Sequence, residues 1–471
     1  MLRTALSGVL ALIALTHTPV TGATNARPNI LLCIGDDFAW PHAGCYGDPV
    51  VRTPNIDRLA RDGARFNFAF SAAPSCTPSR AAILTGQAPH RLGDGANLHS
   101  TLDKQFAVYP DLLEQAGYAV GFTGKGWGPG NFKAGGRERN PAGPNFKSFA
   151  SFLETVPTNR PFCFWFGSTD PHRPYDKGAG LRAGLDPAKV SVPAFWPDAP
   201  EVRGDILDYY VEVQRFDADV GGLLKQLEAR GQVENTLVVV SGDNGWPFPR
   251  AKANLYDAGT RQPLLVRWPA RVKSGLAFND YINLADLAPT FLEAAGLKAP
   301  PEMTGKSFLA LLIGAERPGQ RDRVFLERER HANVRAGNLG FPARAVRTRD
   351  FLYIRNLAPH RWPAGDPEKW KAVGPFGDCD NGPTKQFILD HRAEPGVKNY
   401  FRLCFEKRPA EELYDLKKDP HQVENVAMQP GYAKAKKQLR LMLDEWMERT
   451  GDPRATGVDA RWDNSPYFGR E

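Results

Sequence analysis

The sequence predicts an α/β fold with a mostly parallel central sheet, helices on both faces, and a smaller C-terminal α+β subdomain. Apolar, strand-like runs alternate with segments of helical periodicity over roughly the first three hundred residues. The strand-like runs are continuously apolar, as in sheets buried on both faces. Near residue 343 the pattern changes to short strands and long loops. We therefore expect a main domain over residues 24–342 and a subdomain over residues 343–471.

The main domain begins with a strand over 29–34 (NILLCI), followed by a helix over 53–63. Thr53 is the expected N-cap of that helix and Pro54 opens its first turn. The same reasoning gives the remaining elements of the main domain, which are strands over 119–123, 162–167, 236–241 and 263–268 and helices over 111–116 and 205–230.

The subdomain begins with a predicted hairpin of strands 343–348 and 350–355. A long loop over 358–383, rich in Pro, Gly and Trp, is of the kind that shapes a substrate cleft. A strand over 412–415 and a terminal helix near 432–449 complete the chain.

The N-terminal segment over 1–23 has the features of a signal peptide. Arg3 supplies the positive charge, residues 5–15 are apolar, and Thr21-Gly22-Ala23 offers a cleavage site. The apolar run is too short for the roughly 20 residues of a membrane-spanning helix, and no other stretch approaches that length. We expect export to the periplasm or the cell exterior, with no membrane span and no lipid anchor.

Composition and charge narrow the range of partners. The 471 residues are 42% hydrophobic and 24% charged, as in ordinary globular proteins. The net charge of +7 is mild and favours an anionic substrate. There is no Lys/Arg tract of the kind that binds nucleic acid, so we expect no nucleic-acid partner.

The six cysteines do not form a disulfide framework in so long a chain. Cys33 and Cys163 lie in apolar runs and are expected to be buried free thiols. Cys379 and Cys404 are the best disulfide candidates, because both lie late in a chain bound for an oxidising compartment.

Cys76 belongs to the most informative motif, Cys76-Thr77-Pro78-Ser79-Arg80, which is followed by a run of small and apolar residues ending at Gly86. The sequence offers no second Cys or His at zinc-binding spacing. Arg80 would lie one helical turn after Cys76.

Two polar pairs follow predicted strands directly. Asp36-Asp37 follows strand 29–34, and Asp243-Asn244 follows strand 236–241. The carboxyl ends of such strands share one edge of the sheet, so the pairs can converge. Oxygen donors alone suit a hard cation, and four side-chain ligands favour calcium over magnesium. Either pair alone could equally be a helix cap or a turn.

Three further cations lie near the same edge. Lys125 follows strand 119–123, His172 follows strand 162–167, and Lys252 precedes the segment 254–261. Singly, each could be a solvated or structural residue. Together with Arg80 they predict a site that stabilises developing negative charge.

These motifs resemble those of the type I sulfatase family, within the alkaline-phosphatase-like superfamily, from Arg27-Pro28-Asn29-Ile30 to Asp419-Pro420. The resemblance implies that a maturation enzyme converts Cys76 to formylglycine, whose hydrate attacks sulfur. It implies a calcium site formed by Asp36, Asp37, Asp243, Asn244 and the modified Cys76. Arg80 and Lys125 would steady the nucleophile, while His172 and Lys252 would bind sulfate and assist the leaving group.

One position departs from the family pattern. Many members carry Gly-Lys-x-His, whereas here Lys125 is followed by Gly126 and Trp127. Either another residue replaces that histidine, or deprotonation of the hydrate relies on calcium and Lys125.

Within the family, the closest resemblance is to the heparan N-sulfatases, or sulfamidases. It rests on Asp170-Pro171-His172-Arg173, the segments 244–249 and 254–256, and the stretch 341–347. It implies an exported hydrolase of sulfated carbohydrate that acts on N-sulfoglucosamine in glycosaminoglycan degradation. A sulfated sugar needs cationic and bidentate contacts, so the expected sugar-binding residues are Arg173, His331, Arg335 and Arg344. These arginines could equally be surface residues on an irregular segment.

Three other functions remain open. The chain could hydrolyse O-sulfate esters of polysaccharides, or act as a phosphodiesterase or phosphonate hydrolase of the same superfamily. It could also be a non-catalytic relative that binds glycans. A two-zinc phosphatase is disfavoured, because the 9 histidines form no Asp-x-x-x-His cluster. The sequence leaves the oligomeric state open.

Overall fold

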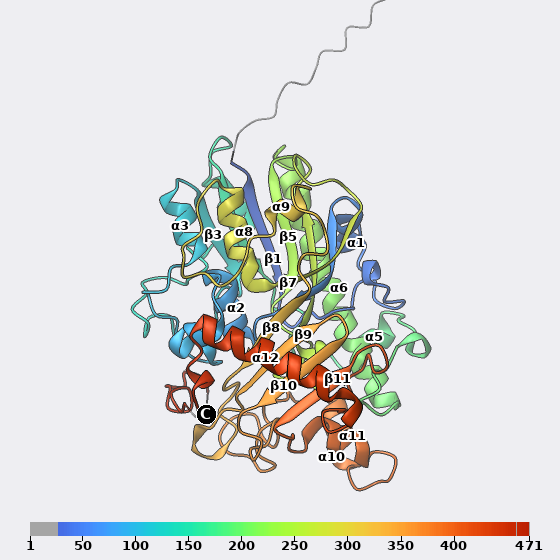
Figure 1. Ribbon diagram of the computed structural model, residues 1–471. Helices are drawn as coiled ribbons and strands as arrows, with labels where there is room; N and C mark the ends of the chain where they lie inside the picture. Colours follow the sequence, from blue (N-terminus) through green and yellow to red (C-terminus); the bar gives the residue numbers. More distant parts are fainter. Residues whose placement is uncertain (1–26, 458, 471) are drawn as a thin grey trace, which may run out of the picture.

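The computed structural model describes residues 27–457 and 459–470, so the signal peptide expected over 1–23 lies outside the described residues. The described chain contains a central seven-stranded sheet and a second, four-stranded sheet (Figure 1). The strand orders are β3-β4-β1-β5-β6-β2-β7 and β11-β10-β9-β8. None of the helices in these residues is both long and apolar enough to cross a bilayer.

Four parallel strands form one half of the central sheet. They are β3 (Ala119–Gly124), β4 (Phe162–Gly167), β1 (Asn29–Gly35) and β5 (Thr236–Gly242). In the other half, β6 (Arg261–Arg267) runs antiparallel to both β5 and β2 (Ala64–Phe70), and β7 (Leu276–Asn283) is parallel to β2. The expectation of a mostly parallel sheet is therefore confirmed, with β6 as the exception.

Alternate residues of the buried strands enter two separate cores. In β1, Ile30 and Leu32 enter one core, whereas Leu31 and Cys33 enter the other. The first core is covered by helices that include α2 (Cys76–Thr85), α3 (Tyr109–Gln115), α8 (Leu287–Ala294) and α9 (Leu309–Leu312). The second is covered by helices that include α1 (Pro54–Arg61), α4 (Phe149–Glu154), α6 (Pro200–Ala229) and α11 (Lys398–Phe405). Both faces of the sheet are thus buried, as the apolar strands indicate. Three further helices, α5 (Ala179–Arg182), α7 (Asp257–Thr260) and α10 (Pro383–Asp390), complete the α-helical elements of the described chain apart from α12.

The second sheet is antiparallel throughout. It contains β8 (Arg323–Arg328), β9 (Ala343–Thr348), β10 (Phe351–Asn356) and β11 (Glu411–Asp415). Helix α12 (Ala433–Thr450) crosses one face (Figure 1), where Leu443 packs with Val346 and Tyr353. The other face packs against side chains of the main domain, including Phe70 and Tyr281. Strand β8 pairs with β9 although it precedes residue 343, so this sheet begins at Arg323. The division of the chain at residue 343 remains a prediction.

Helix α1 shows how local chemistry differs from expectation. It starts at Pro54 with Thr53 at the N-cap, as the sequence predicts, but the Thr53 hydroxyl makes no capping hydrogen bond. That hydroxyl instead accepts the Gly44 amide at 2.9 Å and donates to the Asp57 carboxylate at 3.1 Å. It therefore ties the helix to the preceding loop.

The cysteines correct one expectation. Cys33 and Cys163 are buried thiols, as predicted, but Cys379 and Cys404 are also free thiols and form no disulfide. The Cys379 thiol donates to the carbonyl of Asp380 at 3.6 Å, and the Cys404 thiol donates to the carbonyl of Phe195 at 3.4 Å. Both side chains pack within the apolar core, where a thiol behaves as a small hydrophobic group.

Candidate active site

The carboxyl ends of the four parallel strands carry the main groups of the site. Asp36 and Asp37 follow β1, and Asp243 and Asn244 follow β5. Lys125 directly follows β3, and His172 lies in the loop after β4. Because β3, β4, β1 and β5 are consecutive in the sheet, these ends share one edge, as expected.

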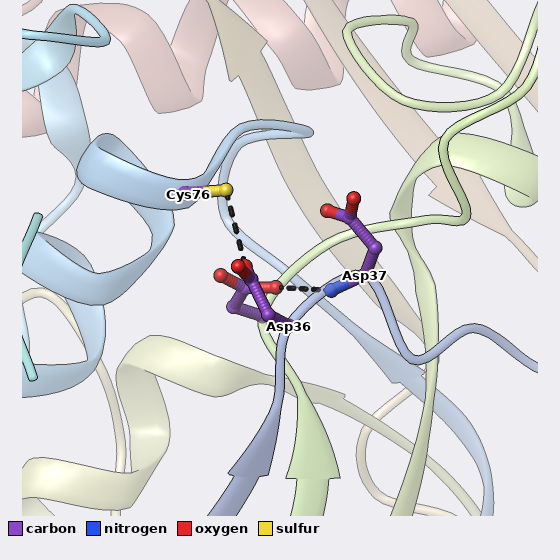
Figure 2. A group of neighbouring side chains, drawn as sticks. Asp36, Asp37 and Cys76 are labelled. Atoms are coloured by element: carbon purple, nitrogen blue, oxygen red, sulfur yellow. Dashed lines mark hydrogen bonds between the residues drawn. The ribbon is translucent and has the colours of Figure 1, made fainter. Parts of the chain in front are cut away.

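Cys76 is the first residue of α2, and the helix lies against this edge. Its sulfur points toward Asp36 (Figure 2), with Sγ 3.4 Å from Asp36 Oδ1. The side chain is buried, and burial together with the nearby Asp36 carboxylate raises the pKa of the Cys76 thiol well above its ordinary value. An activated cysteine nucleophile needs the opposite shift.

The site holds a set of donors suited to a cation. One ligand atom each from Asp36, Asp37, Cys76 and Asp243 lies within 4.8 Å of all the others. Beside them, the Asn244 side-chain nitrogen donates to Asp37 Oδ1 at 2.6 Å, which leaves Asn244 Oδ1 buried without a hydrogen-bond partner. Buried amide oxygens are rarely left unpaired. Three carboxylates and one free amide oxygen fit a hard divalent cation.

The backbone at this edge is strained in a way that favours a functional role. Asp37 has a φ of 69°, a left-handed conformation that non-glycine residues seldom adopt. Its amide donates to Asp243 Oδ1 at 3.0 Å, and so links the ends of β1 and β5. Gly242, at the end of β5, allows this approach, because a Cβ there would lie 1.8 Å from the carbonyl of Phe38.

Three basic side chains pair with the carboxylates. Lys125 Nζ lies 2.6 Å from Asp36 Oδ2, and Lys252 Nζ lies 2.8 Å from Asp37 Oδ2. Arg80 Nε donates to Asp243 Oδ2 at 2.7 Å. The Arg80 guanidinium is buried completely, one helical turn from Cys76.

The surroundings shift the pKa values of Asp36 and Asp37 in opposite directions. Burial opposes ionisation of Asp36, but Lys125, His172 and Arg80 hold the pKa of its carboxyl well below the ordinary value. Burial raises the pKa of Asp37, although Lys252 and His172 act to lower it. The negative charges of Asp36 and Asp243 raise it further. A divalent cation would relieve this repulsion among the carboxylates.

His172 is the most exposed of the predicted catalytic side chains, at 35%. Its Nδ1 donates to the carbonyl of Arg173 at 2.5 Å, which fixes the orientation of the ring. Its Nε2 lies 3.9 Å from Asp37 Oδ2 and therefore faces the site. The predicted catalytic residues and metal ligands are thus brought together in the structure.

Two of the arginines expected in a sugar pocket are buried in ion pairs. Arg344 has a fully buried side chain that is bonded to Asp452 and Glu329. Arg335 is likewise buried, against Asp378 and two backbone carbonyls. The expectation that these two residues line an open pocket is corrected, because buried carboxylates already occupy their guanidinium groups.

Arg173 and His331 lie closer to the site. Arg173 forms a bidentate ion pair with Asp205, with both hydrogen bonds at 2.8 Å. The pair stabilises the loop that carries His172. His331 Nδ1 lies 2.8 Å from Ser75 Oγ, next to Cys76. Burial and the charges of Lys252 and Arg328 lower the pKa of His331 to about 3, although the charges of Asp378 and Asp380 act in the opposite direction. The ring is therefore neutral.

Sequence reasoning did not single out two neighbours of the site. Asp380, in the loop between β10 and α10, lies with Oδ2 3.5 Å from Lys252 Nζ. The pKa of His99 is lowered to about 4 by burial and by the charges of Lys125, Lys252 and Arg330. Neither residue follows a strand or belongs to a motif. Only the composition of the loop around Asp380, which is typical of a substrate cleft, indicated a functional role for that segment. Trp127, at the position of the family histidine, is buried in the apolar core, and its indole nitrogen makes no hydrogen bond within the described residues.

Comparison with known proteins accounts for this constellation. A family model described as Sulfatase matches residues 28–297. The chain belongs to the sulfatase family. This sulfatase is therefore a hydrolase of sulfate esters or sulfamates. A second model, described as N-sulphoglucosamine sulphohydrolase, C-terminal, matches residues 242–363.

Curated relatives match nearly the full length of the sulfatase. The N-sulphoglucosamine sulphohydrolase of Homo sapiens is 32% identical, over 92% of this chain and 93% of the relative. An ulvan-active sulfatase of Formosa agariphila is 29% identical, over 92% of this chain and 82% of the relative.

Solved structures support the alkaline-phosphatase-like sulfatase fold. A protein in complex with its substrate D-glucosamine-2-N,6-O-disulfate superposes with a TM-score of 0.68 and 22% identity, covering 92% of this chain and all (100%) of that one. The phosphonate monoester hydrolase of Agrobacterium radiobacter superposes with a TM-score of 0.64 and 17% identity, covering 90% of this chain and 96% of that one. At these identities the likeness concerns the fold alone.

Proposed function

We propose that this sulfatase is an exported enzyme that removes the N-linked sulfate from N-sulfoglucosamine in sulfated saccharides. The observation that carries the proposal is the cluster of Asp36, Asp37, Asp243 and Cys76, whose ligand atoms lie within 4.8 Å of one another. Resemblance to the human sulphohydrolase over 92% of the chain supports the choice of sugar. The signal-peptide features of residues 1–23 support export.

Calcium is the cation that we propose for the site. Asp36, Asp37, Asp243 and the unpaired amide oxygen of Asn244 would hold it, together with the modified side chain at position 76. Calcium bound there would neutralise sulfate oxygens and lower the pKa of an attacking hydroxyl.

Formylglycine is the form of residue 76 that we propose for the active enzyme. Made from Cys76 by a separate maturation enzyme, it would supply a hydrated aldehyde whose hydroxyl attacks sulfur. Arg80 and Lys125, held by Asp243 and Asp36, would fix the position of the nucleophile through the helix and the strand end that carry them.

The remaining cations would act on the substrate. Lys252 would bind a sulfate oxygen from the buried side of the site, and His172 from the exposed side. His172 Nε2 is also the group placed to give a proton to the leaving nitrogen. Overall, one water oxygen ends on sulfur, the sulfur–nitrogen bond breaks, and the free amine takes a proton.

Removal of an O-linked sulfate is the second candidate. It is favoured by the ulvan-active sulfatase of Formosa agariphila, which matches 92% of the chain. The site would perform the same attack on sulfur, with an alcohol oxygen as the leaving atom.

A substrate panel tests the proposal. The protein, co-expressed with a maturation enzyme, would be given glucosamine N-sulfate, glucosamine 6-O-sulfate, an aryl sulfate, a phosphodiester and a phosphonate monoester. We expect free sulfate and amine from the N-sulfate. Release of sulfate from the O-sulfate alone would overturn the sulfamidase proposal in favour of the second candidate. Turnover of only the phosphorus compounds would overturn both.

A further inference from the structure

Asp380 is an acidic residue in the part of the site that would bind the sulfate anion, where basic residues are expected. It comes from the loop between β10 and α10, far in sequence from the metal ligands. Its carboxylate lies within the electrostatic influence of Lys252, His172, His331 and Arg173, which all lower its pKa. It does not belong to the cluster of Asp36, Asp37, Asp243 and Cys76.

The two oxygens of this carboxylate have different surroundings. Asp380 Oδ2 is buried, lies 3.5 Å from Lys252 Nζ, and makes no hydrogen bond within the described residues. The side chain as a whole is nevertheless 27% exposed, so the accessible part of Asp380 lies away from that oxygen. Although burial opposes ionisation, Lys252, His172 and His331 lower the pKa of Asp380 to about 2, so the group is a hydrogen-bond acceptor.

Exposure identifies the side chains that an incoming substrate would meet. His172 is 35% exposed, Asp380 27% and Lys125 19%, whereas Lys252 and Asp36 are each only 4% exposed. Asp380 therefore stands with two cations at the solvent side of the site. Lys252 already has a shorter contact with Asp37, at 2.8 Å, and does not depend on Asp380 for a partner.

We propose that Asp380 determines specificity by accepting a hydrogen bond from an N–H or O–H group of the saccharide, beside the sulfate that is being removed. A carboxylate next to a bound sulfate raises the cost of binding any anion. A substrate that offers a donor at this point recovers that cost. One without a donor does not, because it covers the exposed part of the carboxylate and removes its water without replacing the hydrogen bond. The site would thus favour sulfated saccharides that carry a neighbouring N–H or O–H donor over sulfates without one. This inference rests on the proposed function.

The first test compares two substrates in Asp380→Ala and Asp380→Asn. Glucosamine N-sulfate carries donors, whereas 4-methylumbelliferyl sulfate has none beside the sulfate. We expect Asp380→Ala to lower kcat/KM for the sugar by about 10- to 100-fold and to change that for the aryl sulfate by less than about threefold. Asp380→Asn, which keeps one acceptor oxygen, should lose less. The matched control is Asp390→Asn, an exposed charge change on neighbouring α10 that should affect neither substrate.

The second test measures binding without turnover. In a Cys76→Ser background, titration with glucosamine N-sulfate and with inorganic sulfate should show that Asp380→Ala weakens only the sugar. An equal loss for both ligands, or for both substrates of the first test, would mean that Asp380 acts by positioning Lys252, and would overturn the inference. No change in either test would also overturn it. Failure of the proposed function is distinguishable, because it appears as a wild-type enzyme that releases no sulfate from the sugar.

Discussion

Lys252 Nζ lies 2.8 Å from Asp37 Oδ2, and both groups are closed to solvent. Burial opposes the charge on Lys252, but Asp37 and Asp380 raise the pKa of its ammonium group well above the ordinary value. The pair places a permanent positive charge at the edge of the sheet where β1 and β5 end. It also offsets the repulsion of Asp37 by Asp36 and Asp243.

Replacement of Lys252 should therefore be costly to catalysis. We expect Lys252→Ala to lower kcat by at least about 100-fold, because a preorganised cation at the sulfate is lost. Lys252→Arg should restore part of the rate, since its charge can reach Asp37. Initial rates on an aryl sulfate measure both variants. A rate within threefold of wild type for Lys252→Ala would remove this residue from the proposed mechanism.

The unpaired oxygen of Asn244 gives a prediction about metal binding. Asn244→Ala removes one neutral metal ligand and also the hydrogen bond to Asp37, whose carboxylate keeps its contact with Lys252. We expect its calcium affinity to fall by about 10- to 100-fold in a calorimetric titration of metal-free protein, while the fold is retained. Asn381→Ala, which changes an exposed residue of a loop, is the control and should bind calcium with the affinity of wild type. Equal affinities for Asn244→Ala and wild type would exclude Asn244 as a ligand.

Arg344 should matter for stability and not for substrate choice. Its guanidinium is buried between Asp452 and Glu329, so Arg344→Ala leaves two carboxylates without their partner. We expect a loss of about 3–5 kcal/mol in the free energy of unfolding, measured with urea. Arg440→Ala, which breaks the more exposed pair with Glu411, should cost less than about 1 kcal/mol. A change in the ratio of kcat/KM between sugar and aryl sulfate in Arg344→Ala would restore the sugar-pocket role that the structure contradicts.

Asp48 gives a pH-dependent contribution to stability. Burial opposes its ionisation, but hydrogen bonds from His42, Tyr210 and the Val50 amide lower its pKa to about 2. Since the folded-state pKa is below the ordinary value of 3.8, the stabilisation is complete above that value and is lost as the pH falls through about 2. The shift corresponds to about 2 kcal/mol at pH 7. The difference in unfolding free energy between wild type and Asp48→Asn should therefore shrink by about half from pH 7 to pH 3. A difference that stays constant over this range would contradict the assignment.

The sequence predicted the catalytic edge well, because its signals are local. Continuously apolar runs locate the buried strands, and the residues that follow them lie at the carboxyl ends of a parallel sheet. That rule alone placed Asp36, Asp243 and Lys125 together. The direction of β6 was not predictable in this way, since an apolar run carries no information on strand orientation.

The predictions that failed concern contacts between segments that are distant in the sequence. Arg344 pairs with Asp452, which is 108 positions away in the sequence, and no local pattern predicts that pair. Asp380 contacts Lys252 from the loop between β10 and α10, which is more than one hundred residues away in sequence. The pairing expected for Cys379 and Cys404 rested on compartment and position alone, which carry no geometry.

The central claim is that a modified residue 76 shares a divalent ion with four oxygen donors. A crystal structure of the matured protein grown with calcium tests it most directly. We expect an aldehyde or its hydrate at position 76, and one density peak about 2.3–2.6 Å from oxygens of Asp36, Asp37, Asp243 and Asn244. An unmodified thiol at position 76, with no ion among these four side chains, would contradict the account.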